Sequence, residues 1–340
     1  MNGPRASSAR ARTAASFVVP ARTSPRASLW IAGYRTLHMP FAAVGTARRY
    51  RVSLDADDAS VVCVGRREPF RRLLTRVFDG RAQLEEVSPG WPLWNPHRLW
   101  PANAALVAVE LHPFFARRFR AAGWLICPKL VRWQGLLSQM PPAEPSGSLR
   151  EDLRRVKSRG YTLEESTGSR RDWREFEQEM LLPYAQQRFG DEARRPAPGL
   201  LREVRKRGTL LFLIQEGRRV AGGCMLCDGG EVWFAALGIK GGDIDLMRDG
   251  AIAGLYALGI EWANRLGMHR FDASSTSAFE LDGLARYKRK WGMSPVREPL
   301  TPLIAVRVDP RHEALRLAIE RQPFWIESEG DSLDIYRGPR

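Results

Sequence analysis

A carboxylate followed by small hydroxyl side chains stands near the end of the second half of the chain. Asp272 ends a stretch that is otherwise apolar, and Ser274 and Ser275 stand two and three residues after it. A carboxylate in this position can take a proton from an amine or a hydroxyl, and it can equally cap the turn that follows a strand. Glu231 is a weaker candidate base, because an acid placed after two glycines is commonly solvated.

A basic and aromatic string follows these residues, Ala285-Arg-Tyr-Lys-Arg-Lys-Trp-Gly292. On a helix, Lys288 and Lys290 diverge by about 200° and therefore cannot bind one phosphate together. One of them can face a bound donor, and a solvated surface position is the alternative for either.

The sequence lacks the motifs of several enzyme classes. There is no G-x-S-x-G nucleophile elbow, no H-E-x-x-H zinc motif and no Walker A loop, which counts against hydrolases, zinc proteases and NTPases. Cys224 and Cys227 have C-x-x-C spacing, but on a strand they point to opposite faces and cannot share a metal without a bend. We therefore expect buried thiols, no metal, and a reducing cytoplasm as the location.

The spacing of apolar residues predicts the elements that hold these side chains. The second half reads as two helices, three antiparallel strands, a loop, a long helix, a strand, a short helix and a last strand. The predicted ranges are Leu149–Arg159, capped by Ser148 together with Glu151, Asp172–Arg188, Thr209–Gln215, Arg219–Cys227, Glu231–Ile239, Gly250–Leu266, His269–Ser275, Leu281–Trp291 and Pro302–Val308.

Length and composition predict two units of domain size. The chain has 340 residues, of which 44% are hydrophobic, and no apolar run is long enough to span a membrane. A proline-rich linker after Met140 suggests the boundary. The expected organisation is a basic arm at 1–49, an N-terminal α/β lobe at 50–145, a second lobe at 146–308 and a C-terminal extension at 309–340.

The net charge of +15 comes largely from the N-terminal arm, because residues 1–54 hold nine arginines and no acid. The chain also has 47 arginines against 6 lysines, which is typical of codon bias. The charge therefore does not favour nucleic acid as a major partner, with tRNA as the exception that stays open.

The order of elements in residues 148–308 resembles the GNAT N-acyltransferase fold, and in particular its FemAB-like and polysaccharide-cluster branch. The letters that carry the resemblance are Arg270-Phe-Asp-Ala-Ser-Ser275, the Ala285–Gly292 string and the basic segment Leu149–Lys157. The resemblance implies a mixed α/β (α+β) fold with a mostly antiparallel sheet flanked by helices. It also implies that the N-terminal lobe can be a degenerate copy of the same fold.

The resemblance further implies direct transfer of an acyl group from acyl-CoA, such as acetyl-CoA, to an amine or hydroxyl of a small molecule, sugar or peptide. The acyl arm would lie between the strands Glu231–Ile239 and His269–Ser275, with Tyr287 protonating the leaving group and Asp272 or Glu231 as base. The remaining residues implied in donor binding are Ala235, Leu237, Ile239, Arg248, Asp249, Gly250, Ser275 and Lys288.

The loop that would bind the donor's pyrophosphate departs from the family pattern. Lys240–Arg248 carries two acids and one glycine pair instead of spaced glycines. Two alternatives therefore stay open: transfer from aminoacyl-tRNA, and a binding protein that kept the fold without catalysis.

Overall fold

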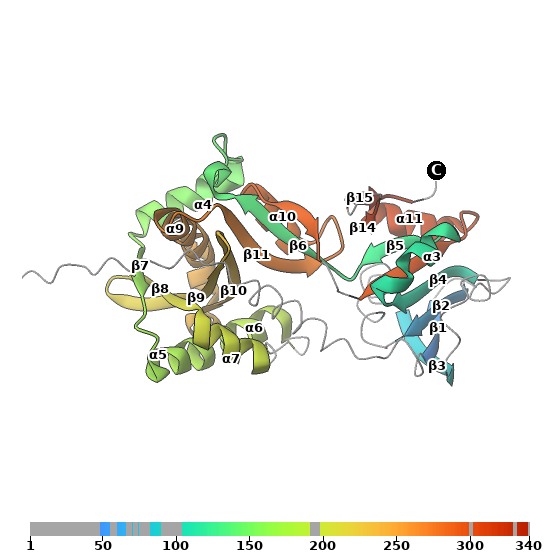
Figure 1. The fold of residues 1–340 in the computed structure, drawn as a ribbon, viewed down its shortest axis with the longest axis horizontal. Coiled ribbons are helices and arrows are strands. Elements are labelled where there is room, and N and C mark those ends of the chain that lie inside the picture. The colour runs from blue at the N-terminus through green and yellow to red at the C-terminus, as the bar shows by residue number, and fades with distance from the viewer. Residues whose placement is uncertain are drawn as a thin grey trace, which may run out of the picture.

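The computed structural model describes residues 48–54, 60–65, 70, 74, 82–89, 104–190, 198–298, 302–328 and 332–338. Nearly all of the basic arm lies outside these residues. Figure 1 shows two lobes, each built on one large sheet. The sheet of the first lobe has the order β3-β1-β2-β4-β13-β5, and that of the second has the order β12-β6-β11-β10-β9-β8-β7.

The strands and helices have the following bounds. The first sheet contains β1 (Arg48–Leu54), β2 (Ser60–Gly65), β3 (Ala82–Pro89), β4 (Ala104–Leu111), β5 (Leu125–Pro128) and β13 (Leu303–Val308). The second contains β6 (Leu130–Leu136), β7 (Thr162–Glu165), β8 (Thr209–Gln215), β9 (Arg218–Asp228), β10 (Glu231–Ile239), β11 (Arg270–Ser277) and β12 (Ser294–Arg297). The helices are α3 (Ala116–Ala121), α4 (Gly147–Ser158), α5 (Arg170–Glu175), α6 (Leu182–Phe189), α7 (Pro198–Arg207), α8 (Ile244–Arg248), α9 (Ala251–Arg265), α10 (Gly283–Lys290) and α11 (Glu313–Arg321), with a π-helical segment, Phe176–Leu181, between α5 and α6.

Two strands belong to a sheet that is built mainly from the other half of the chain. β6, from the first half, joins the second sheet, and β13, from the second half, joins the first sheet. β6 pairs with β11 and β12 in the second sheet, although β5 just before it belongs to the first. β13 in turn lies between β4 and β5 in the first sheet. The division between the sheets therefore does not coincide with residues 145 and 146, because distant pairing and not local sequence decides which sheet a strand joins.

The C-terminal extension packs on the first lobe. Leu315 and Ile319 of α11 are buried in one cluster with Tyr50, Val61 and Ile304 of the first sheet. After α11, the strands β14 (Phe324–Glu327) and β15 (Leu333–Tyr336) form a small antiparallel sheet. The extension is thus part of the first lobe's hydrophobic core.

The predicted mixed, mostly antiparallel sheet flanked by helices is confirmed. In the second sheet every pair of neighbouring strands is antiparallel except β10 and β11. These two strands pair in parallel over only three residues, from Glu231 with Arg270 to Trp233 with Asp272, and then separate. On its other side β10 keeps its pairing with β9 up to Ile239, with a bulge between Phe234 and Ala236.

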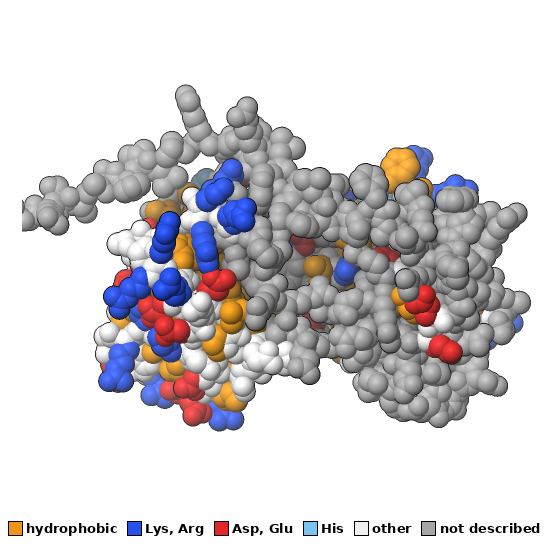
Figure 2. Space-filling model, turned by 90° about the horizontal axis from the view of Figure 1, so that it is seen from below, with side chains coloured by type: hydrophobic (Ala, Val, Ile, Leu, Met, Phe, Trp, Pro, Cys, Tyr) orange, Lys and Arg blue, Asp and Glu red, His pale blue; other side chains and the backbone are white. Residues whose placement is uncertain are grey.

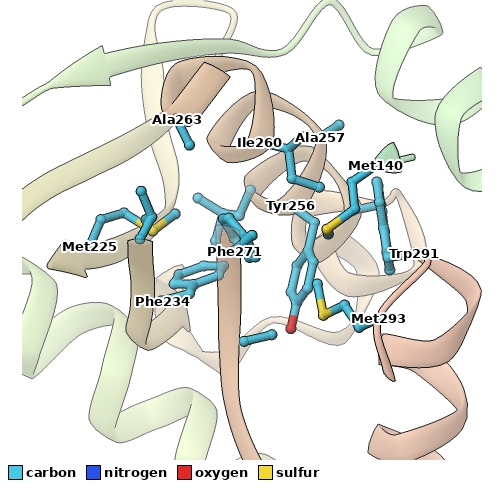
Figure 3. Packing of buried hydrophobic residues seen from close by; sticks show 14 of the residues in the cluster. Met140, Met225, Phe234, Tyr256, Ala257, Ile260, Ala263, Phe271, Trp291 and Met293 are labelled. Carbon is cyan, nitrogen blue, oxygen red and sulfur yellow. The ribbon is translucent and has the colours of Figure 1, made fainter. Parts of the chain in front are cut away.

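Helices cover both faces of the second sheet. α9 buries Leu255, Tyr256 and Ile260 against one face, where Phe234 and Phe271 lie. In Figure 3 the ring of Tyr256 lies between Phe271 and Trp291. The π-helical segment and α7 cover the other face through a cluster that includes Phe176, Met180 and Val204. Figure 1 shows α5, α6 and α7 together below the sheet and α9 above it.

The sequence-based boundaries need a few local corrections. α4 is capped by Ser146, whose hydroxyl accepts a hydrogen bond from the backbone N–H of Leu149, and not by Ser148. Glu151 binds Arg154 and Arg155 instead of closing a capping box. The loop after β10 contains the short helix α8. All four cysteines are free, and Cys224 and Cys227 do point into opposite clusters.

Gly238 allows the π-helical segment to approach β10 closely. A Cβ atom on Gly238 would lie 2.4 Å from the carbonyl carbon of Met180 and from the nitrogen of Leu181, both of them backbone atoms. We expect Gly238→Ala to lower the free energy of unfolding by about 2 kcal/mol, because packed backbone cannot move aside cheaply. Urea unfolding measures this difference. Gly283→Ala is the matched control, since a Cβ there meets nothing within 4 Å. Equal effects of the two substitutions would contradict the expectation.

Candidate functional site

Lys288 is a buried lysine at the place where β10 and β11 separate. It lies on α10, it is 4% exposed, and its Nζ donates hydrogen bonds to the carbonyl oxygens of Ser274 (3.0 Å) and Ser275 (3.4 Å). Burial lowers its pKa from the usual 10.5 to about 8, and the carboxylates around it, Asp272 first among them, oppose this effect. The lysine therefore carries most of a positive charge near neutral pH in a place that water hardly reaches.

α10 is fixed at this place by a cap that reaches back to β11. Asp282 accepts hydrogen bonds from the backbone N–H groups of Leu284 (2.8 Å) and Ala285 (3.2 Å) at the start of the helix. It also accepts one from the hydroxyl of Ser277 on β11 (2.7 Å). This cap holds the first turn of α10 against the strand, so that Lys288 points at the carbonyls of β11.

Ser274 forms the kink that ends the parallel pairing. Its φ of +62° lies in the left-handed region, and its backbone N–H donates to Asp272 Oδ1 (2.7 Å). Its hydroxyl donates to the carbonyl oxygen of Phe234 (2.9 Å) and accepts a hydrogen bond from Trp233 Nε1 (2.6 Å). A single side chain thus bridges β10 and β11 just past their last ladder pair, Trp233 with Asp272. Ser275 turns the other way and donates to the buried carboxylate of Glu298.

Asp272 positions this kink instead of presenting a free carboxylate. Its side chain is fully buried and binds Arg132 Nε, Gln134 Nε2 (3.2 Å) and the N–H of Ser274. Arg132 and Gln134 both come from β6, the strand that joins the second sheet although β5 just before it belongs to the first. The hydrogen bond from the N–H of Ser274 is the contact expected for the capping role, one of the two roles that the sequence leaves open for Asp272.

Tyr287 lies on another side of α10, in an aromatic group with Tyr256 (5.4 Å between ring centroids) and Trp291 (6.4 Å). Its hydroxyl is buried and has no hydrogen-bond partner among the described residues. Burial raises the pKa of Tyr287 well above its usual value. Lys290 Nζ stands 4.4 Å from the centre of the ring and forms an ion pair with Asp152. The phenol of Tyr287 therefore keeps its proton near neutral pH.

The other residues that the sequence analysis expected in the site lie apart from Lys288 and Asp272. Glu231 is at the start of β10, where it forms a half-exposed ion pair with Arg270 (3.3 Å). Arg248 binds Asp245, and the backbone oxygen of Arg248 accepts from Arg155 of α4 (3.2 Å). The carboxylate of Asp249 forms an ion pair with Arg159, the residue that follows α4. Gly250 caps α9 with a φ of +92°.

The bulge in β10 divides the three strand residues expected to hold the donor. Ala235 packs with the cluster beneath α5 and α7, whereas Leu237 and Ile239 pack on the α9 side. The structure thus brings Asp272, Ser275 and Lys288 together. It leaves Glu231 and the segment from Arg248 to Gly250 elsewhere.

Sequence reasoning missed Ser274, Trp233, Arg132 and Glu298 as parts of this group. Ser274 had a weak signal, since it follows the strand's carboxylate by two residues. Arg132 and Glu298 had none, because both reach the site through strands whose pairing is distant in sequence.

The lowered pKa of Lys288 predicts a pH-dependent stability. Between about pH 8 and 10.5 the unfolded chain keeps a proton on this lysine that the folded chain has released. The free energy of unfolding of the wild type therefore rises with pH across this window relative to that of Lys288→Met, which lacks the titrating group. Urea unfolding of both proteins at about pH 7.5 and 9.5 measures the change. The same difference at both pH values would show that Lys288 keeps its usual pKa.

Comparisons with family models and with curated protein sequences found no match. Similar solved structures include L-PGS from Bacillus licheniformis, with 12% identity, a TM-score of 0.41, and coverage of 87% of this chain and 95% of that chain. FemX has 12% identity, a TM-score of 0.39, and coverage of 76% and 88%. A GCN5-related N-acetyltransferase from Kribbella flavida has 16% identity, a TM-score of 0.31, and coverage of 86% and 98%.

Among the residues that the structure describes, no helix is long and apolar enough to cross a membrane. In the second sheet, β7 to β11 are neighbours in chain order, and only β10 and β11 are parallel before they separate, which agrees with the mixed, mostly antiparallel sheet that the resemblance implied.

Proposed function

We propose that this chain is an acyltransferase that moves an acyl group from a thioester or ester carrier to an amine or a hydroxyl. The observation that supports this most is the separation of β10 from β11 directly beside the buried ammonium group of Lys288. From Phe234 to Ile239, β10 has no ladder partner on β11. An extended acyl arm that contains amides can add to such an edge by strand-like hydrogen bonds.

In the proposed reaction the acceptor nitrogen or oxygen attacks the carbonyl carbon of the acyl group. The new bond forms as the carbonyl π electrons move to oxygen, and Lys288 stabilises the resulting oxyanion. The bond to the carrier's sulfur or oxygen then breaks, and Tyr287 protonates the leaving atom. The acceptor's proton passes to solvent and Tyr287 regains its own from there. Asp272 acts as a positioning residue through Ser274 and not as the base.

Acyl-CoA is the proposed donor, with its phosphates near the start of α9, where free N–H groups favour anions. Arg155, Arg159 and Arg248 surround this helix start. Aminoacyl-tRNA is the second candidate, and one specific observation favours it. The carboxylate of Asp249 stands at the same helix start, paired with Arg159, where a pyrophosphate would have to displace it.

Donor binding tests the proposal first. Thermal-shift measurements on the full chain with acetyl-CoA, longer acyl-CoAs, free CoA and aminoacyl-tRNA identify the carrier, because a ligand that binds only the folded state raises the melting temperature. Release of free CoA thiol, or of deacylated tRNA, in the presence of small amines, amino sugars and peptides then measures transfer. Binding of a carrier without transfer to any acceptor would instead support a non-catalytic binding protein.

Tyr287→Phe tests the role of the leaving-group acid. We expect transfer to fall by about 10²-fold while stability stays equal or rises, because the substitution removes a buried hydroxyl that has no partner among the described residues. Tyr336→Phe, in the C-terminal hairpin of the first lobe, is the matched control and should leave transfer unchanged. Unchanged transfer in Tyr287→Phe would remove this residue from the mechanism.

A further inference from the structure

A cavity lies in the helical layer on the side of the sheet opposite α9. Its volume is about 420 Å³, within the range of small-molecule sites. Its walls come from α5, the π-helical segment and α7, together with the turn before α5. The lining residues are Gly168, Arg170, Trp173, Arg174, Glu177, Gln178 and Arg205.

The cavity has an excess of positive charge. Arg170 and Arg174 are four residues apart, so they stand on one face of α5. Both are exposed, and neither makes a hydrogen bond or ion pair with any other described residue. Arg205 reaches in from α7 and forms an ion pair with Glu177. Three arginines thus face one carboxylate in the lining.

Two unpaired like charges on one helix face repel each other and destabilise the helix slightly. Nearby acids do not relieve them, because Asp172 and Glu175 of the same helix are both bound to Arg219 on β9. An anion with several oxygens placed between Arg170 and Arg174 would remove this repulsion. The guanidinium group is suited to phosphate because it can donate two parallel hydrogen bonds.

Trp173 gives the cavity an aromatic wall. The residue is 6% exposed and is held by an edge contact with Phe176 (6.2 Å between ring centroids). Phe176 is itself fully buried beneath the sheet, so the indole is a fixed surface. Figure 2 shows the face that carries α5 and α7, where Lys and Arg side chains gather around small hydrophobic areas.

We propose that this cavity binds the phosphate group of a small phosphorylated molecule, with Arg170 and Arg174 on the phosphate and the organic part against Trp173. The site uses none of the residues of the proposed acyl transfer. Its test is therefore a binding measurement, and its outcome does not depend on that reaction.

Isothermal titration calorimetry of the full chain with inorganic phosphate and with AMP tests the proposal at low ionic strength. We expect one molecule of AMP per chain, bound more tightly than inorganic phosphate because of the contact with Trp173. Arg170→Gln and Arg174→Gln should each weaken AMP binding by about tenfold or more. Arg171→Gln and Arg202→Gln remove the same charge from exposed positions that do not line the cavity, and they should weaken it less than twofold.

Because Arg170 and Arg174 have no partners among the described residues and repel each other, their substitution should leave the melting temperature unchanged or raise it slightly, which separates lost binding from lost folding. Absence of AMP binding to the wild type would overturn the proposal. Equal weakening by the lining and control substitutions would also overturn it, since that result indicates diffuse attraction. Binding of a single-stranded RNA without binding of AMP would overturn the proposal as well.

Discussion

Asp272→Asn should lower the free energy of unfolding by about 3 kcal/mol. The Asp272 carboxylate is fully buried and binds Arg132, Gln134 and the N–H of Ser274. Removing one partner of a buried ion pair leaves the other charge uncompensated, which typically costs 3–5 kcal/mol. We take the lower end because the side chain of Arg132 is 20% exposed and an asparagine oxygen can still accept the bond from Ser274. Urea unfolding measures the loss.

Glu231→Gln is the matched control for this substitution. It removes the same kind of charge from the same parallel strand pair, but its ion pair with Arg270 is 44% and 43% exposed. Exposed ion pairs are worth about 0–1 kcal/mol, so the control should stay within about 1 kcal/mol of the wild type. A similar small loss in both variants would show that Asp272 is not a buried structural anchor, and it would reopen the interpretation of this carboxylate as a base.

The local sequence was sufficient to predict most of the second lobe's elements, but it missed β7, α7, α8 and β12 and did not indicate the pairing of all the strands. β8 and β10 have the predicted bounds, because each is a run of apolar residues between turn signals. β6 and β13 could not be assigned to their sheets, since their patterns are satisfied equally well in either lobe. The position of β6 in the second sheet matters for the site, because Arg132 and Gln134 of this strand donate hydrogen bonds to Asp272.

The sequence predicted those residues of the candidate site that lie close together along the chain. Asp272, Ser275 and Lys288 belong to one strand and the helix that follows it, and they meet. The kink at Ser274 was not predictable, because a serine with positive φ has no pattern of its own and is held by Trp233 and Phe234 of the neighbouring strand. The bulge in β10 escaped prediction for a similar reason. An inserted residue changes the alternation of faces without changing the run of apolar letters.

Lys288→Met should reduce acyl transfer by about 10²–10³-fold, which is the usual loss when one donor to a developing oxyanion is removed. Methionine keeps the length and apolar stem of the side chain but cannot donate to the carbonyls of Ser274 and Ser275. We expect the rate constant to fall while the affinity for the carrier changes little, because the charge is needed most in the transition state. Steady-state rates with the identified carrier, together with its thermal shift, separate the two effects.

Lys290→Met provides the control on the same helix. Lys290 lies over the ring of Tyr287 and pairs with Asp152, but it makes no contact with the kink at Ser274. Its substitution should change transfer by no more than about threefold, in keeping with the small energies of a partly exposed pair and a cation–π contact. If Lys288→Met folds, binds the carrier and transfers at the wild-type rate, the buried lysine only fastens α10 to β11. The oxyanion would then have to be stabilised without Lys288, by backbone N–H groups of β10 beyond its pairing with β11.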